Sequence, residues 1–92
     1  MEPVIYTIEL SRRAERQLRA FPREVRARIG RSIDALSRQP VPPGARKLSG
    51  HDDLYRVRAG DYRIVYTVQH EVLIVLVVAI GHRREIYDRL PK

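Results

Sequence analysis

The chain has 92 residues, a formal net charge of +7 and a hydrophobic fraction of 43%. This length predicts a single domain over residues 1–92 with one modest core, and the hydrophobic fraction excludes a disordered chain. The absence of cysteine excludes disulfides, thiolate metal sites and a cysteine nucleophile, and it fits a reducing cytoplasm.

No membrane segment is expected. The first ten residues, MEPVIYTIEL, contain an acidic residue and no long apolar run, so they do not resemble a signal peptide. The longest apolar run, Val72–Ile80, has nine residues, whereas a bilayer span needs about 20. We therefore expect a cytoplasmic protein without membrane contact.

Arginine dominates the charge. Only two of the eighteen basic residues are lysine, and the planar guanidinium group binds phosphate oxygens in pairs and stacks on bases. This composition favours a polyanionic partner, RNA first, and also suits an acidic protein partner. A basic surface that only keeps the protein soluble is the plainer alternative.

The first half of the chain predicts a strand and two helices. Residues 5–10 alternate as a strand does, with Tyr6, Ile8 and Leu10 on one face. Ser11 is a suitable N-cap for a helix to about residue 20, and Pro22 ends that helix and can start the next one. Each helix carries one apolar stripe among its arginines, which predicts an antiparallel helical hairpin.

The second half predicts a three-stranded meander. A proline-rich connector, residues 39–44, leads into an irregular approach over residues 45–53. A hairpin follows, with strands to about residue 68, and then a turn at residues 69–71. The apolar run 72–80 is typical of a central strand covered on both faces. The expected fold is α+β, with both helices on one face of a small, mostly antiparallel sheet and the other face open.

The hairpin YRVRAGDYRIVY, residues 55–66, carries the main chemical signal. Gly60 and Asp61 suit a two-residue type II′ turn because glycine reaches its positive φ without steric cost. The register then pairs Arg58 with Arg63 and places both on one face together with Arg56. Like charges directly opposite each other cost about 0.2–1 kcal/mol. An anion bound between them is the simplest explanation for this arrangement.

Such a cluster suits metal-independent RNA cleavage, with Arg83 and Tyr87 added from the polar segment after the last strand. Guanidinium groups would stabilise the charge that develops on the phosphate when a 2′-hydroxyl attacks it. Of the three histidines, His82 is the best-placed acid or base, although a capping role is equally open; His51 and His70 suit loop and turn positions. Scattered histidines match no standard metal site, so no metal or cofactor is expected.

Three segments together resemble the RelE/ParE superfamily of bacterial type II toxins, and most closely its RelE-like branch. They are KLxG at residues 47–50, YRVRxGDYRIVY at 55–66 and GHRxxIY at 81–87. The resemblance covers nearly the whole chain. It implies a compact α+β toxin that cuts messenger RNA in the ribosomal A site without metal, through attack by the 2′-hydroxyl.

Carried over position by position, the resemblance places the basic pair of the first hairpin strand on Arg56 and Arg58 and the transition-state arginine on Arg63. The later arginine falls on Arg83, and the tyrosine that orients the substrate falls on Tyr87. The prototype has lysine at the positions of Arg56 and Arg58, and an arginine does not lose its proton. The general base is therefore left open between His82 and Asp61. Arg46, Lys47 and Arg84 are expected to contact RNA.

The resemblance also implies partners and alternatives. A cognate acidic antitoxin would neutralise the toxin, and operator DNA would be bound only through the complex of the two. ParE-like members share the fold but poison DNA gyrase, so a gyrase inhibitor is one alternative. A non-catalytic regulator that binds only its antitoxin and operator is another.

Overall fold

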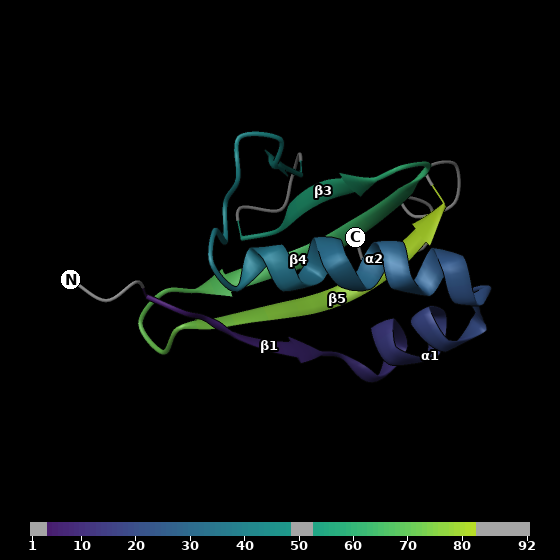
Figure 1. The fold of residues 1–92 in the computed structure, drawn as a ribbon. Coiled ribbons are helices and arrows are strands. Elements are labelled where there is room, and N and C mark those ends of the chain that lie inside the picture. The colour runs from purple at the N-terminus through teal and green to yellow at the C-terminus, as the bar shows by residue number, and fades with distance from the viewer. Residues whose placement is uncertain (1–3, 49–52, 83–92) are drawn as a thin grey trace.

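A computed structural model describes residues 4–48 and 53–82 (Figure 1). In these ranges two helices lie on the same face of a five-stranded sheet. The helices are α1 (Arg12–Ala20) and α2 (Arg23–Leu36). The strands are β1 (Thr7–Leu10), β2 (Arg46–Lys47), β3 (Tyr55–Ala59), β4 (Tyr62–Gln69) and β5 (Ile74–His82). The predicted α+β fold is confirmed.

The strand order in the sheet is β1-β5-β4-β3-β2. Strand β1 pairs with β5 in parallel, and the other neighbours are antiparallel. The apolar run therefore forms a central strand, as expected, but its bounds were wrong. A turn with a left-handed residue, Leu73 at φ 57°, moves the start of β5 to Ile74. Apolar composition alone could not locate that turn, because Val72 and Leu73 are as apolar as the strand that follows although both are exposed in the turn.

The core lies between the helices and the sheet. Ile29, Ile33 and Leu36 of α2 pack there with Ile64 and Tyr66 of β4. A second, small cluster lies on the other face of the sheet, where Leu48 and Leu54 cover Val65 and Ala79. The prediction of an open second face was therefore wrong in part, since Leu48 and Leu54 cover some of it.

Helix α1 is tied to an irregularity in β5. The pairing of β4 with β5 shifts by one residue at Val65 and Tyr66, which leaves Val78 as an extra residue in β5. The hydroxyl of Ser11 donates to the carbonyl of Val78 at 3.0 Å and accepts from the amide of Ala14 at 3.1 Å, as the predicted N-cap. Beyond the end of β1, the side chain of Gln17 accepts the amide of Ile80 at 2.7 Å. Side chains of α1 and of its cap thus form hydrogen bonds with backbone groups of β5 that β1 does not reach.

In the described residues no helix is both long and apolar enough to cross a membrane.

The proline-rich connector is fixed by Tyr66. This side chain is fully buried, and its hydroxyl donates to the carbonyl of Pro40 at 2.7 Å. Burial, with a smaller contribution from the neighbouring Tyr55, raises the pKa of Tyr66 from 10.0 to about 12. The connector is therefore attached to the core through a neutral phenol.

The pKa of Tyr66 makes stability depend on pH in the alkaline range. Unfolded Tyr66 ionises near pH 10 and folded Tyr66 near pH 12, so its stabilising contribution is complete below pH 10 and is lost as the pH rises to 12. By pH 11 the loss is about 1 kcal/mol. The difference in free energy of unfolding between the wild type and Tyr66→Phe should shrink by that amount between about pH 8 and pH 11 in urea titrations. A difference that does not change with pH would contradict this.

The hairpin turn depends on Gly60, whose φ is +64°. A side chain in this conformation costs about 1–2 kcal/mol, so Gly60→Ala should lower the free energy of unfolding by that amount in chemical denaturation. Gly44→Ala is the matched control, because a Cβ on Gly44 meets nothing within 4 Å and its φ is ordinary. The control should change stability by less than about 0.5 kcal/mol; equal losses at both positions would count against the turn assignment.

Candidate functional site

The arginines of the hairpin share the face that the sequence predicts. Strands β3 and β4 pair Ala59 with Tyr62, Arg58 with Arg63 and Val57 with Ile64, which confirms the predicted register. Val57 and Ile64 belong to the core beneath the helices. Alternation along the strands therefore directs Arg56, Arg58 and Arg63 to the opposite face.

Strand β2 adds another arginine to this face. Arg46 lies directly opposite Arg56 in the antiparallel pairing of β2 with β3. The expectation of an irregular approach over residues 45–53 missed this pairing, because the two residues of β2 are too few to show the alternation of a strand. The sheet thus contains two pairs of opposed arginines, Arg46 with Arg56 and Arg58 with Arg63.

Arg46, Arg56 and Arg58 line one pocket of about 280 Å³, together with Gly44. None of these described lining residues is acidic, so the described walls carry three positive charges. Gly44 has no side chain, which lets a ligand approach the backbone there. The mutual repulsion of the three charges is relieved when an anion enters. The guanidinium groups offer donors that match a phosphate group.

Arg63 occupies a different environment from the other three. It is 7% exposed, and its Nη1 donates to the backbone carbonyls of Gly60 at 3.2 Å and Tyr62 at 3.1 Å. Its Nε is buried without a hydrogen-bond partner among the described residues. The expected open placement of Arg63 was therefore wrong: the side chain is held against the turn, and the described lining of the arginine pocket does not include it.

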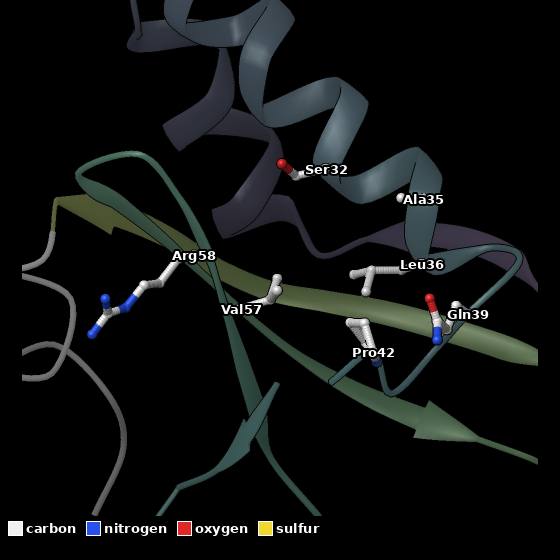
Figure 2. A pocket seen from close by; sticks show the side chains of 7 residues that line it. All are labelled: Ser32, Ala35, Leu36, Gln39, Pro42, Val57 and Arg58. Atoms are coloured by element: carbon white, nitrogen blue, oxygen red, sulfur yellow. The ribbon is translucent and has the colours of Figure 1, made fainter. Parts of the chain in front are cut away.

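Arg58 borders a second hollow. A groove of about 150 Å³ separates α2 from β3 and the connector, and its lining includes Ser32, Ala35, Leu36, Gln39, Pro42, Val57 and Arg58. Figure 2 shows the guanidinium of Arg58 pointing away from the apolar side chains of this groove. Its aliphatic stem therefore lies at the groove, while its charged end is exposed to a ligand from outside.

Two other predicted residues lie on the helix side of the sheet. Lys47 pairs with Tyr55, and its Nζ lies 6.0 Å from the centre of the Tyr55 ring. His82 pairs with Tyr62, and the two rings meet edge to face at 5.9 Å. Because Tyr55 and Tyr62 pack against the core beneath the helices, the sheet separates both Lys47 and His82 from the arginine pocket.

His70 lies in the turn between β4 and β5, as expected for a turn residue, and its Nδ1 is 2.7 Å from the hydroxyl of Tyr6. His51, Arg83, Arg84 and Tyr87 lie outside the described residues. In the two described ranges no three acidic, histidine or cysteine side chains gather as metal ligands would.

Comparison with known proteins agrees with this fold. Residues 8–87 match the family described as the ParE toxin of the type II toxin–antitoxin system parDE. Toxin RelG of Mycobacterium tuberculosis is 31% identical over 88 residues, which cover 91% of this chain and 98% of RelG. The mRNA interferase toxin RelE of Escherichia coli is 30% identical over 91 residues, which cover 95% of each chain.

A solved structure shows the same architecture. The toxin–antitoxin complex RelBE2 of Mycobacterium tuberculosis contains a chain that matches with a TM-score of 0.79 and 26% identity, covering 89% of this chain and 95% of that one. The family match spans most of the chain, and the similarity to the toxins RelG and RelE extends over nearly their full length. The chain therefore belongs to the ParE toxin family of type II toxin–antitoxin systems, within the RelE/ParE superfamily.

Proposed function

We propose that this toxin is an endoribonuclease that cuts messenger RNA in the ribosomal A site without a metal ion. The observation that carries the proposal is the pocket formed by Arg46, Arg56 and Arg58. The similarity of the whole chain to the mRNA interferase toxin RelE of Escherichia coli supports the proposal of the same activity.

In the proposed reaction the 2′-oxygen of a ribose forms a bond to the adjacent phosphorus, and the bond from phosphorus to the 5′-oxygen breaks. The 2′-hydroxyl proton passes to a base, and the leaving 5′-oxygen takes up a proton. The products are a 2′,3′-cyclic phosphate and a 5′-hydroxyl. Negative charge develops on the non-bridging oxygens, so fixed guanidinium groups stabilise the transition state more than the substrate.

The arginines have separate tasks in this proposal. Arg56 and Arg58 bind the scissile phosphate, and Arg46 approaches it from β2. Arg63, which is fixed to two carbonyls of the turn and lies outside the described lining of the pocket, keeps the transition-state role that the family resemblance implies. Arg83 and Tyr87 keep the roles of phosphate and nucleotide binding that the family resemblance implies, and Arg84 that of an RNA contact.

Proton transfer needs a group other than these arginines, because guanidinium does not deprotonate at physiological pH. The two candidates are His82 at the end of β5 and Asp61 in the hairpin turn. Because the sheet separates His82 from the pocket, His82 can act only on a strand of RNA that passes round the end of the sheet. The cleavage rates of His82→Gln and Asp61→Asn separate the two candidates, because loss of the group that transfers the proton should slow cleavage about 10²–10⁴-fold, whereas the other substitution should not.

The partners follow from the charge and from the relatives. We propose a cognate acidic antitoxin, because the chain carries a net charge of +7 and a similar chain occurs in the RelBE2 toxin–antitoxin complex. Ribosome-bound mRNA is the substrate, which places the toxin in the cytoplasm. Operator DNA is contacted only through the antitoxin complex.

Inhibition of DNA gyrase is the second candidate, because the matching family is described as a ParE toxin. Such a poison acts through protein contacts and has no need of a phosphate pocket. Mapping mRNA ends on purified ribosomes beside a gyrase cleavage assay distinguishes the two activities. Gyrase-dependent DNA breaks without mRNA cleavage would overturn the nuclease proposal.

Substitution in the pocket should remove cleavage without unfolding the protein. Arg58 is exposed, so Arg58→Ala should leave the melting temperature nearly unchanged while the rate of ribosome-dependent mRNA cleavage falls about 10²-fold, as for loss of one transition-state donor. Arg56→Ala should have a similar effect on the rate. Arg23→Ala, on the exposed start of α2, is the charge-matched control. Rates within about twofold of the wild type for both pocket variants would refute the site.

The chemistry itself can be tested on the RNA. A 2′-O-methyl group on the nucleotide before the scissile phosphate should abolish cleavage, because it removes the attacking hydroxyl. A phosphorothioate at that phosphate should slow cleavage equally in Mg²⁺ and in Mn²⁺, since no metal contacts the substituted oxygen. Rescue of the phosphorothioate by Mn²⁺ would instead indicate metal-assisted cleavage.

A further inference from the structure

Arg28 of α2 lies over the turn of the β3–β4 hairpin. A Cβ built on Gly60 would lie 2.8 Å from Nη1 of Arg28 and 3.6 Å from its Cδ, so the arginine side chain rests directly on the glycine. Figure 1 shows the beginning of α2 and the β3–β4 turn at the same end of the molecule. Glycine is needed here for its φ of +64°, and its lack of a side chain lets the end of the Arg28 side chain lie against the turn.

Arg28 adds positive charge to a turn that already holds two arginines. Arg58 and Arg63 are opposed just before and after the turn, and Nη1 of Arg63 is bound to the carbonyl of the same Gly60. The Nε of Arg63 is buried without a partner in the described part of the chain. The guanidinium groups of Arg28 and Arg63 therefore both contact Gly60, and Arg58 lies one residue before the turn.

Among the residues that the structure describes, no carboxylate neutralises Arg28. Between residues described in the structure, Arg28 has no ion pair within 4.0 Å, and Asp61 of the turn has none either. An arginine that served only to stabilise the turn would be expected to pair with that aspartate. Arg28 instead adds to the repulsion between the neighbouring guanidinium groups, which an anionic ligand would offset.

We propose that Arg28 binds a second backbone phosphate of RNA, at the helix side of the hairpin turn. The inference rests on the proposed RNA substrate and adds a binding subsite to it. Arg28 projects from α2, whereas Arg46, Arg56 and Arg58 line the pocket on the other face of the sheet. One strand of RNA that passes the turn can thus place one phosphate in the pocket and a flanking phosphate on Arg28.

This role differs from that of the pocket arginines in its kinetic effect. The flanking phosphate undergoes no bond change, so Arg28 binds it equally in the substrate and in the transition state. Uniform binding of this kind lowers KM and leaves kcat unchanged. Arg28 is therefore an affinity determinant and not a catalytic residue.

Direct RNA binding tests the proposal independently of cleavage. The full chain and its variants are titrated into a fluorescently labelled, 2′-O-methylated RNA oligonucleotide at several salt concentrations. Arg28→Gln should weaken binding about fivefold, the effect of one exposed charge-assisted contact. The slope of log K against log salt should also become shallower by about 0.7, the value for one phosphate of a single strand. Arg28→Lys should recover most of the slope, because it restores the charge.

Arg26→Gln is the matched control. It removes the same charge from an exposed position of the same helix, but two residues correspond to about 200° around the helix axis, so Arg26 points away from the turn. In ribosome-dependent cleavage, Arg28→Gln should raise KM about fivefold with kcat unchanged.

The outcomes separate this proposal from that of the nuclease. Binding that depends on Arg28 in a wild-type protein that cleaves no mRNA supports the phosphate subsite and overturns the nuclease. An unchanged affinity and salt slope in Arg28→Gln overturns the subsite, and so does an equal loss in Arg26→Gln, which would reflect net charge alone. A loss of stability in Arg28→Gln with normal RNA binding also overturns it, because Arg28 would then only pack on the turn.

Discussion

The register of the β3–β4 hairpin is the constraint on which the site depends. Gly60 closes the turn at φ +64°, and this fixes Val57 opposite Ile64 and Arg58 opposite Arg63. A slip by one residue would turn the arginines toward the core and the apolar residues toward the solvent. Burial of Ile64 beneath the helices therefore stabilises the same register that gathers the positive charges on the other face.

The protein tolerates repulsion on that face because the core offsets it. Two cross-strand pairs of arginines cost up to about 1 kcal/mol each. The buried Nε of Arg63, which has no hydrogen-bond partner in the described ranges, adds to the cost. Fully buried residues of β4 and β5, including Tyr66, Val75 and Val77, provide the compensating apolar burial. This repulsion between like charges is concentrated on the face where we propose that a phosphate binds.

Helix α1 and strand β5 act as the support of this arrangement. The extra residue Val78 changes which side chains of β5 face the helices, and Ser11 and Gln17 bond to the strand on both sides of that irregularity. Beyond it, Ile80 packs in the core and His82 meets Tyr62 on the helix side. The extra residue Val78 therefore gives Ser11 a carbonyl to bind at the start of α1. It also sets the side of the sheet on which His82 lies, away from the pocket.

The sequence by itself determined the features that are local. Ser11 as a helix cap, the break at Pro22, the turn at Gly60 and the alternation around it follow from φ preferences and strand periodicity over a few residues. These features predicted the helices, the hairpin register and the common face of Arg56, Arg58 and Arg63.

Only the tertiary structure decided the features that join distant segments. The pairing of Arg46 with Arg56 depends on a two-residue strand too short to carry a pattern of its own. The burial of Arg63, the position of Lys47 on the helix side and the contact of Arg28 with Gly60 depend on how strands and helices pack. No local preference encodes these contacts, because each is set by segments far apart in the chain whose packing together buries the core.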